Sequence, residues 1–180
     1  MRIVTWNINS VRLRINSVKK VVKKLNPDIL CLQETKCLKE DFPFKDFEKM
    51  GFVDTEVIGI KGYNGVCIAS RHPISSIDKH IFFNKDDARH MNIEFLYKNK
   101  KIIIHNFYVP AGGDEPDPKI NNKFKHKLKF LEEAAKLFSN KKSAKNDLVV
   151  LVGDLNTVSY THLRAHETGR NVVCRLLLEK

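Results

Sequence analysis

The first thirty residues predict a strand, an amphipathic helix and a second strand. Residues 3–8 form an apolar run with β-branched side chains, which is typical of a buried strand. Residues 11–25 carry apolar side chains at helical spacing, with Ser10 placed to cap the helix and Pro27 just beyond its end. Residues 29–32 are again apolar. A β-α-β opening of this kind favours parallel pairing of its two strands, as in α/β folds.

The middle of the chain predicts two β-hairpins. Residues 53–60 and 66–70 flank an Asn-Gly pair at 64–65, which is a strong turn signal because both residue types tolerate positive φ. Residues 91–96 and 102–108 flank a polar stretch and predict a second hairpin.

A loop, a long helix and a last strand complete the pattern. Residues 109–118 are rich in Pro, Gly and acidic side chains, and a helical pattern then runs from about residue 121 to 139. Residues 148–152 form a last apolar strand, which makes the whole an α/β chain with mixed sheets. The expected inner face of the long helix consists of Phe124, Leu128, Leu131, Ala135 and Phe138.

Polar side chains recur where the apolar strands end. A carboxamide or carboxylate in a buried strand is costly unless it is paired or bound to a metal, and several strand ends can converge on one rim. Oxygen ligands of this kind suit Mg²⁺. Singly, each residue could instead be a turn former or a helix cap. The residues concerned are Asn7, Gln33, Glu34, Asn106, Tyr108, Asp154 and Asn156.

The formal net charge of +11 favours a polyanionic partner, although lysine-rich solvated faces are also common. The four cysteines form no C-x-x-C pair, which argues against zinc and for thiols in a reducing compartment. No apolar run approaches the ~18 residues of a membrane helix. The chain begins directly in a strand pattern without a signal peptide, so a cytoplasmic protein that does not bind membranes is expected.

Five segments, in this order, resemble the signatures of the exonuclease III branch of the endonuclease/exonuclease/phosphatase superfamily. They are Thr-Trp-Asn-Ile-Asn-Ser-Val-Arg at 5–12, Leu-Gln-Glu-Thr-Lys at 32–36, Gly-Tyr-Asn-Gly-Val at 62–66, Asn-Phe-Tyr-Val-Pro at 106–110 and Gly-Asp-Leu-Asn at 153–156. The resemblance implies a four-layer α/β/β/α sandwich of two mixed sheets, similar to DNase I. It also implies a monomeric DNA-repair hydrolase that uses Mg²⁺, or Mn²⁺ in its place. Members of this branch cut double-stranded DNA 5′ to abasic sites and act at 3′ ends.

The resemblance also implies roles for individual residues. Glu34 is expected to be the principal Mg²⁺ ligand, and Asn7 to position the metal or the scissile phosphate. Tyr108 is expected at the phosphate as a hydrogen-bond donor or a phenolate. Asp154 is expected to orient or deprotonate the attacking water, and Asn156 to bind a phosphate oxygen. Three further side chains are expected to contact DNA: Arg89, Asn9 and Arg12.

The family continues well beyond the Gly-Asp-Leu-Asn segment, and its second half supplies a further Asp and a Ser-Asp-His segment that this chain lacks. Residues 158–168 instead read as a translated transposase-based sequencing adapter, and residues 173–180 as the adjoining flow-cell primer. We therefore expect residues 1–157 to be the N-terminal part of the nuclease domain, and residues 158–180 to be a non-native tail. The chain alone is then expected to be inactive, with the inner face of its remaining sheet exposed.

Two other functions compete with this interpretation. One is a phosphohydrolase of the same superfamily that acts on inositol phosphates or sphingomyelin. The other is a non-catalytic nucleic-acid-binding module. The Asn-Phe-Tyr-Val-Pro segment and the basic charge favour DNA over phospholipid head groups.

Overall fold

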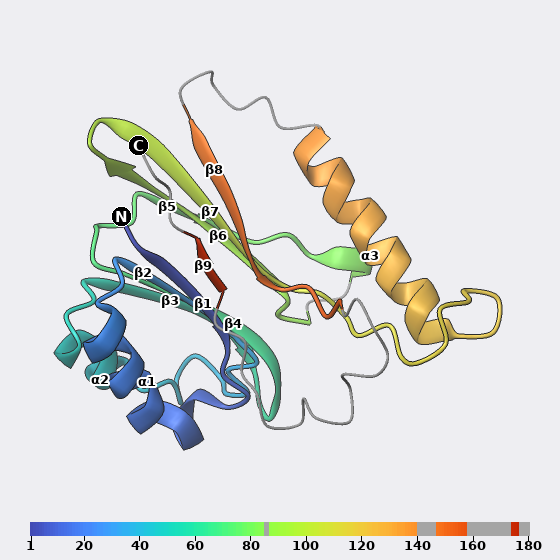
Figure 1. The fold of residues 1–180 in the computed structure, drawn as a ribbon, viewed down its shortest axis with the longest axis horizontal. Helices are drawn as coiled ribbons and strands as arrows, with labels where there is room; N and C mark the ends of the chain where they lie inside the picture. Colours follow the sequence, from blue (N-terminus) through green and yellow to red (C-terminus); the bar gives the residue numbers. More distant parts are fainter. Residues whose placement is uncertain (85–86, 140–146, 158–173, 177–180) are drawn as a thin grey trace.

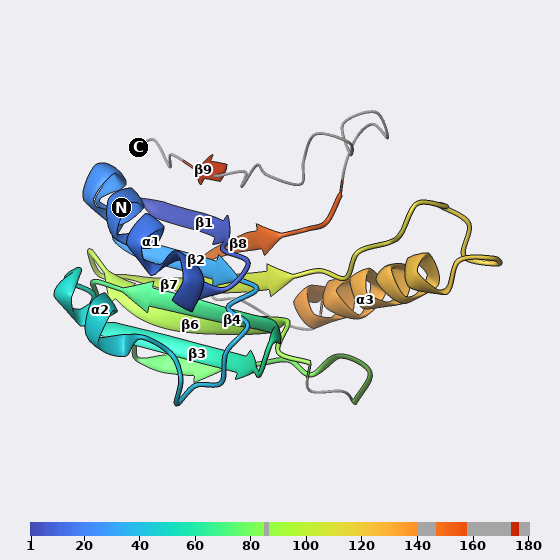
Figure 2. The same ribbon diagram turned by 90° about the horizontal axis from the view of Figure 1, so that it is seen from below.

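The structure is a computed structural model that describes residues 1–84, 87–139, 147–157 and 174–176. It has four layers (Figure 1): helices α1 (Val11–Leu25) and α2 (Phe44–Lys49), two β-sheets, and helix α3 (Asn122–Ser139). Figure 2, turned by 90°, keeps α1 and α2 on one side of the molecule and α3 on the other. The expected α/β/β/α sandwich is confirmed.

The first sheet has the strand order β3-β4-β2-β1-β9. As predicted, β1 and β2 are parallel, and α1 connects them. The short β9 pairs antiparallel with β1. Apart from β9, the expected tail lies outside the described residues. The strands are β1 (Ile3–Asn7), β2 (Ile29–Gln33), β3 (Asp54–Ile60), β4 (Tyr63–Ser70) and β9 (Cys174–Leu176).

The second sheet has the order β5-β6-β7-β8, and only its β7–β8 pair is parallel. The predicted hairpin between β6 and β7 is confirmed, with a tight turn at Lys98 and Asn99, both at positive φ. The strands are β5 (Ser76–Asp78), β6 (His90–Tyr97), β7 (Lys100–Tyr108) and β8 (Leu148–Asp154), and a 3₁₀ turn at Phe82–Asn84 precedes β6.

Two local predictions in the first sheet are wrong. The β3–β4 hairpin turns at Lys61 and Gly62, since Ile60 already pairs with Tyr63, so the Asn-Gly pair at 64–65 lies inside β4. The Ser10 side chain makes no cap hydrogen bond. Instead, the backbone N–H of Ser10 donates to the carbonyl of Glu34 (2.7 Å), so the end of β2 anchors the start of α1.

The main core lies between the two sheets, which corrects the expectation of an exposed inner face. The described chain supplies strands to both sheets, so each inner face covers the other. No helix among the described residues is long and apolar enough to cross a membrane. The buried side chains between the sheets are Ile3, Ile29, Cys31, Val66, Ile68, Met91, Ile93, Phe95, Ile102, Ile104, Val150 and Val152.

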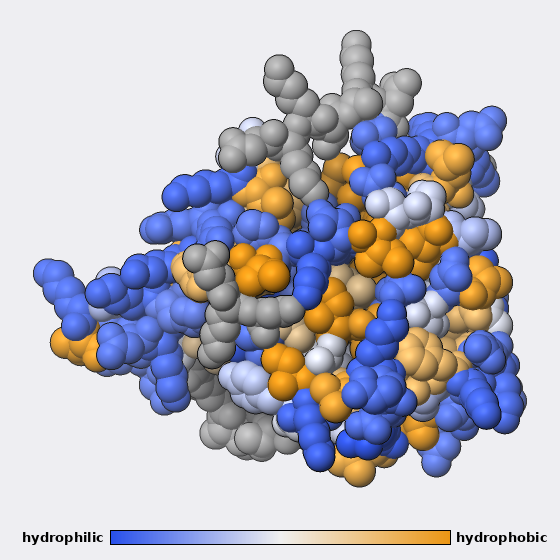
Figure 3. Space-filling view, turned by 180° about the vertical axis from the view of Figure 1, so that it is seen from behind, coloured by the Kyte–Doolittle hydropathy of each residue, from blue (hydrophilic) through white to orange (hydrophobic). Residues whose placement is uncertain are grey.

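The face that α3 presents to the second sheet agrees with the prediction only in part. Its buried residues are Lys127 and Phe130, and Phe138 packs against the same cluster, whereas Leu131 is 39% exposed. Phe138 was predicted on this face, whereas Lys127 and Phe130 were not. The outward side near the start of α3 is mostly hydrophilic (left in Figure 3).

Candidate active site

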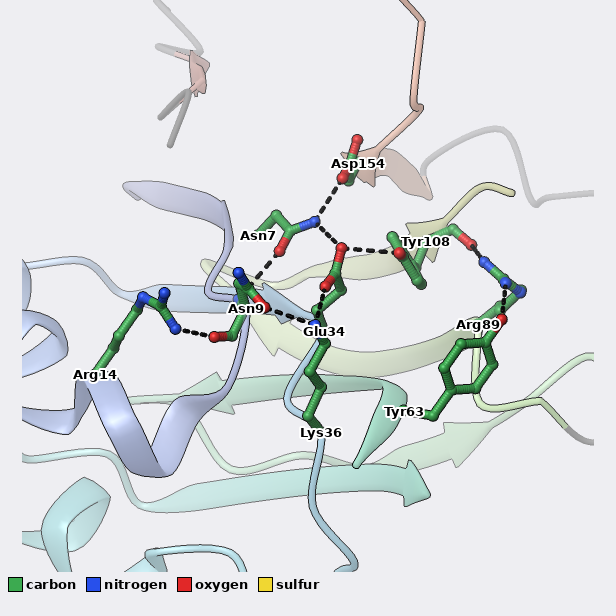
Figure 4. Close-up of polar contacts among 9 residues, drawn as sticks. All are labelled: Asn7, Asn9, Arg14, Glu34, Lys36, Tyr63, Arg89, Tyr108 and Asp154. Atoms are coloured by element: carbon green, nitrogen blue, oxygen red, sulfur yellow. Dashed lines mark hydrogen bonds and ion pairs between the residues drawn. The ribbon is translucent and has the colours of Figure 1, made fainter. Parts of the chain in front are cut away.

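Four strand ends from both sheets converge at one rim of the sandwich (Figure 4). One carboxylate oxygen of Glu34, Oε1, accepts hydrogen bonds from Asn7 Nδ2 (2.8 Å) and the Tyr108 hydroxyl (2.8 Å). Asn7 Nδ2 also donates to Asp154 Oδ2 at 2.7 Å. Asn7 ends β1 and Glu34 directly follows β2 of the first sheet, whereas Tyr108 and Asp154 end β7 and β8 of the second. The site therefore exists only where the two sheets meet.

Lys36 compensates the charge of Glu34, a role that sequence reasoning missed. Its Nζ lies 2.9 Å from Glu34 Oε2 and donates to Asn9 Oδ1 at 2.6 Å. Burial alone would raise the pKa of Glu34, but hydrogen bonds from Asn7, Lys36 and Tyr108 outweigh it and lower the pKa. Glu34 is thus an ionised carboxylate at neutral pH.

Tyr108 is a neutral hydrogen-bond donor in this arrangement. Burial and the neighbouring Glu34 raise its pKa, which disfavours the phenolate. The guanidinium of Arg89 lies over its ring, 4.8 Å from the centroid, and donates to the Tyr108 carbonyl at 3.3 Å. Arg89 also pairs with Asp87 at 2.6 Å, and its side chain is only 9% exposed. Arg89 therefore holds Tyr108 in place through contacts with its ring and its backbone carbonyl.

Asn156 is folded back onto the ends of β7 and β8. Its backbone N–H donates to Asp154 Oδ1 (2.9 Å), and its Nδ2 donates to the carbonyl of Val109 (2.7 Å). Its φ of +48° is left-handed, a conformation that Asn tolerates better than most residues. The turn thereby fixes the orientation of the Asp154 carboxylate.

The turn that carries Glu34 is held by β4. Glu34 and Lys36 both have a φ of +53°. The backbone N–H groups of Thr35 and Lys36 donate to the carbonyls of Gly65 (3.2 Å) and Asn64 (2.9 Å). A Cβ on Gly65 would lie 2.1 Å from Thr35 Oγ1, so only glycine fits there. The Asn-Gly pair thus supports the carboxylate turn instead of making the hairpin turn.

Two of the predicted strand-end residues lie behind the rim. Asn106 is fully buried, and its Nδ2 donates to the carbonyls of Leu32 and Cys67, both at 3.0 Å. Its Oδ1 accepts from Gln33 Nε2 at 2.7 Å. Asn106 therefore joins β7 of the second sheet to β2 and β4 of the first, and Gln33 belongs to this buried link.

Of the three residues expected to contact DNA, only Asn9 lies on the rim itself. Asn9 lies on the rim, where its backbone N–H donates to Asn7 Oδ1 at 3.1 Å. Arg12 is exposed on α1 outside this network. Its neighbour Arg14 reaches the network instead, by donating to the backbone carbonyl of Asn9. Arg89 lies behind Tyr108, as described above.

Gly153 lets β8 approach β7 closely enough for Asp154 to reach the rim. Its φ is +138°, and a Cβ there would lie 1.9 Å from the carbonyl oxygen of Phe107. We expect Gly153→Ala to lower the free energy of unfolding by about 3 kcal/mol, through backbone strain and this clash. Urea denaturation followed by circular dichroism measures the loss.

Gly62→Ala is the matched control. Gly62 has a φ of +72° with nothing within 4 Å of an added Cβ, so only the strain of about 1 kcal/mol should appear. Equal losses in the two variants would show that close approach of the backbones is unimportant at Gly153.

The donor set of the rim fits a hard divalent cation. Glu34 and Asp154 supply carboxylate oxygens, and the Asn7 amide donates a hydrogen bond to each carboxylate. Among the residues that the structure describes, no group of three or more His, Cys, Asp or Glu side chains could hold a metal. A closed cage is therefore absent from that part of the chain. One or two carboxylates with water and substrate phosphate is the arrangement that Mg²⁺ favours.

Comparisons with known proteins agree with this geometry. A model of the Endonuclease/Exonuclease/phosphatase family matches residues 4–171. The chain is 26% identical to exodeoxyribonuclease III of Haemophilus influenzae over 158 residues, 87% of this chain and 57% of that protein. It is 27% identical to a DNA-(apurinic or apyrimidinic site) endonuclease of Dictyostelium discoideum, covering 91% of this chain and 43% of that protein.

Solved structures show the same similarity. An AP endonuclease from Archaeoglobus fulgidus matches with a TM-score of 0.74 and 32% identity, covering 87% of this chain and 57% of that one. A 3′ phosphatase from Neisseria bound to a product DNA hairpin matches with a TM-score of 0.67 and 27% identity, covering 87% and 58%. The chain thus spans a little over half the length of these structures.

Proposed function

Since the chain belongs to the endonuclease/exonuclease/phosphatase family, we propose that it is the N-terminal part of a DNA-repair phosphodiesterase. The proposed enzyme hydrolyses the backbone of double-stranded DNA 5′ to abasic sites and at 3′ termini. The observation that carries this proposal is the junction of Glu34, Asn7, Tyr108 and Asp154 across the two sheets. The named activities of the similar proteins support the choice of DNA as substrate.

Each rim residue has a proposed part in the in-line attack of water on phosphorus. Asp154 orients the water and accepts its proton, since its carboxylate is fixed by Asn7 and by the backbone of Asn156. When substrate is bound, the Tyr108 hydroxyl redirects its one proton from Glu34 to a phosphate oxygen as negative charge develops. The second amide N–H of Asn156, which Val109 does not use, donates to another phosphate oxygen. Mg²⁺ or Mn²⁺ held by Glu34 and Asn7 would supply Lewis-acid stabilisation of that charge.

The proposed DNA contacts surround this rim. Asn9 and the exposed Arg12 lie where a backbone phosphate can approach them, whereas the Arg89 side chain beside Tyr108 is only 9% exposed. The net charge of +11 supports binding to a polyanion, with an affinity that falls as salt rises.

We further propose that residues 1–157 are the N-terminal part of the domain and that residues 158–180 are a non-native tail. The lengths of the relatives support a longer parent, since the chain covers 57% of the Haemophilus protein. The family's second half carries the further Asp and His described above, so the 180-residue chain alone is proposed to be inactive. The parent is proposed to be a cytoplasmic monomer.

Sequencing the gene across codon 157 and assaying both products tests this proposal. We expect the purified 180-residue chain to leave a duplex with one abasic analogue uncut in Mg²⁺ or Mn²⁺. The complete reading frame should incise the same duplex 5′ to the analogue in Mg²⁺, and EDTA should stop it.

Three other results would each contradict a part of this proposal. Mg²⁺-dependent incision by the 180-residue chain would overturn the proposed inactivity. Hydrolysis of phospholipid head groups without cleavage of DNA by the complete protein would favour a different phosphohydrolase of the family. A genomic stop codon directly after Lys180 would contradict the proposed tail.

A further inference from the structure

Lys127 is an almost completely buried lysine on α3, with 6% of its surface exposed. Its Nζ donates to the backbone carbonyls of Leu155, at 3.0 Å, and of Asn156. Lysine is among the residue types that are least often buried, and a buried charge is costly unless it is well compensated. An apolar side chain of similar length would fill the same space without this cost. Packing alone therefore does not explain a lysine at this position.

The two carbonyls belong to the turn that orients Asp154. Asn156 adopts its left-handed φ there and donates its N–H back to Asp154 Oδ1. The backbone N–H of Val109 donates to the carbonyl of Asp154 at 2.9 Å, which ties the turn to the end of β7. A cation that is shared by the carbonyls of residues 155 and 156 holds these two peptide groups on the same side of the turn.

Helix α3 is itself fixed against the loop that leads away from Tyr108. Asn121 Oδ1 accepts from the backbone N–H groups of Lys123 (3.0 Å) and Phe124 (3.2 Å), and its Nδ2 donates to the carbonyl of Gly112 (2.8 Å). A Cβ on Gly112 would lie 3.2 Å from Lys127 Cδ, so the glycine makes room for the lysine stem. These contacts fix the start of α3, and with it the position of the Lys127 ammonium.

The charge of Lys127 also acts on the site. Burial lowers the pKa of Lys127, and the carboxylate of Asp154 opposes that shift. The two groups thus interact electrostatically, although the direct contacts of the ammonium are backbone carbonyls.

We propose that Lys127 is a positioning residue that fixes the Asp154–Asn156 turn and so aims the Asp154 carboxylate at the reacting water. This inference rests on the proposed function for its catalytic meaning. The structural part, that Lys127 holds the turn, stands on the contacts alone.

Amide hydrogen exchange by NMR on the 180-residue chain tests the structural part. In Lys127→Met, we expect the N–H of Asn156 to exchange about 10-fold faster relative to the core N–H of Ile104, because the turn loses its cation. Lys127→Arg, which keeps the donors, should restore most of the protection. Lys129→Met removes an exposed lysine from the same helix and should leave the ratio unchanged.

The kinetic part uses the complete reading frame. We expect kcat for abasic-site incision to fall about 10- to 100-fold in Lys127→Met with KM within about twofold, and to recover in Lys127→Arg. An unchanged Asn156-to-Ile104 exchange ratio in Lys127→Met, or the same change in Lys129→Met, would overturn the positioning role. If Asp154→Asn also leaves incision intact, the proposed function fails, and the exchange ratio still decides whether Lys127 holds the turn.

Discussion

Glu34→Ala should lower the rate of abasic-site incision by the complete reading frame about 10³-fold or more. Glu34 accepts hydrogen bonds from Asn7 and Tyr108 and pairs with Lys36, so its removal takes a partner from each of these three side chains. It also takes away the carboxylate that fits a divalent cation. Single-turnover cleavage of an abasic duplex, measured across a Mg²⁺ titration, gives the effect.

Glu56→Ala is the matched control for Glu34→Ala. Glu56 is also an ion-paired glutamate of the first sheet, but its partner is Lys39 at 3.2 Å, outside the rim network. Its removal should leave incision within about twofold, since a partly exposed pair contributes little. Thermal unfolding of both variants would confirm that they fold.

A measurement of DNA binding shows whether Glu34 serves catalysis or recognition of DNA. We expect Glu34→Ala to bind the abasic duplex in EDTA within about threefold of the unsubstituted protein, because phosphate contacts dominate that affinity. If both Glu34→Ala and Asp154→Ala leave DNA cleavage intact, the rim is not the active site. The non-catalytic nucleic-acid-binding module would then become the better description of this fold.

Asn106→Ala should lower the free energy of unfolding by about 4 kcal/mol. Asn106 is fully buried and bonds Gln33 Nε2 and the carbonyls of Leu32 and Cys67. Alanine removes three buried hydrogen bonds between the sheets and opens a cavity there. The midpoint and slope of urea denaturation would measure the loss.

Asn16→Ala is the control for Asn106→Ala. Asn16 is exposed on α1, where alanine has the higher helix propensity, so the substitution should stabilise the chain by about 0.5 kcal/mol. A loss below about 1 kcal/mol in Asn106→Ala would mean that water or a rearranged Gln33 satisfies the freed groups.

The strand ends illustrate how far sequence reasoning reaches. The apolar runs before Asn7, Glu34, Tyr108 and Asp154 predicted where each strand stops, and the β-α-β opening predicted parallel pairing at the start of the sheet. These signals are local, and the structure confirms them. They do not predict which polar side chains reach the rim and which are buried behind it.

Asn106 and Tyr108 show this limit. They stand two residues apart on β7 and so share one face of the sheet. Asn106 is buried between the sheets, where it donates to carbonyls of β2 and β4, whereas Tyr108 reaches Glu34 at the rim. The packing of β7 across β2 and β4 decides which residue of β7 lies level with the rim. A single sequence carries no direct signal for that offset.

The misplaced face of α3 has a similar cause. Helical periodicity assigns apolar residues to the core, so Leu131 was predicted to lie on the inner face and Lys127 was not included. The observed face includes Lys127, whose ammonium donates to the carbonyl of Leu155 just beyond β8, and such a tertiary contact leaves no trace in helical periodicity. Gly153 was likewise recognised as part of a motif, but the reason for glycine became apparent only from its distance to Phe107.

The hydrogen bond between Asn7 and Asp154 joins residues that are 147 positions apart. During synthesis, β1 leaves the ribosome early, whereas β8 emerges only after nearly all of the described chain. Contacts of such long sequence separation form late in folding, since a large loop must close first. The growing polypeptide therefore has no complete rim until β8 has emerged and the second sheet has closed over the first.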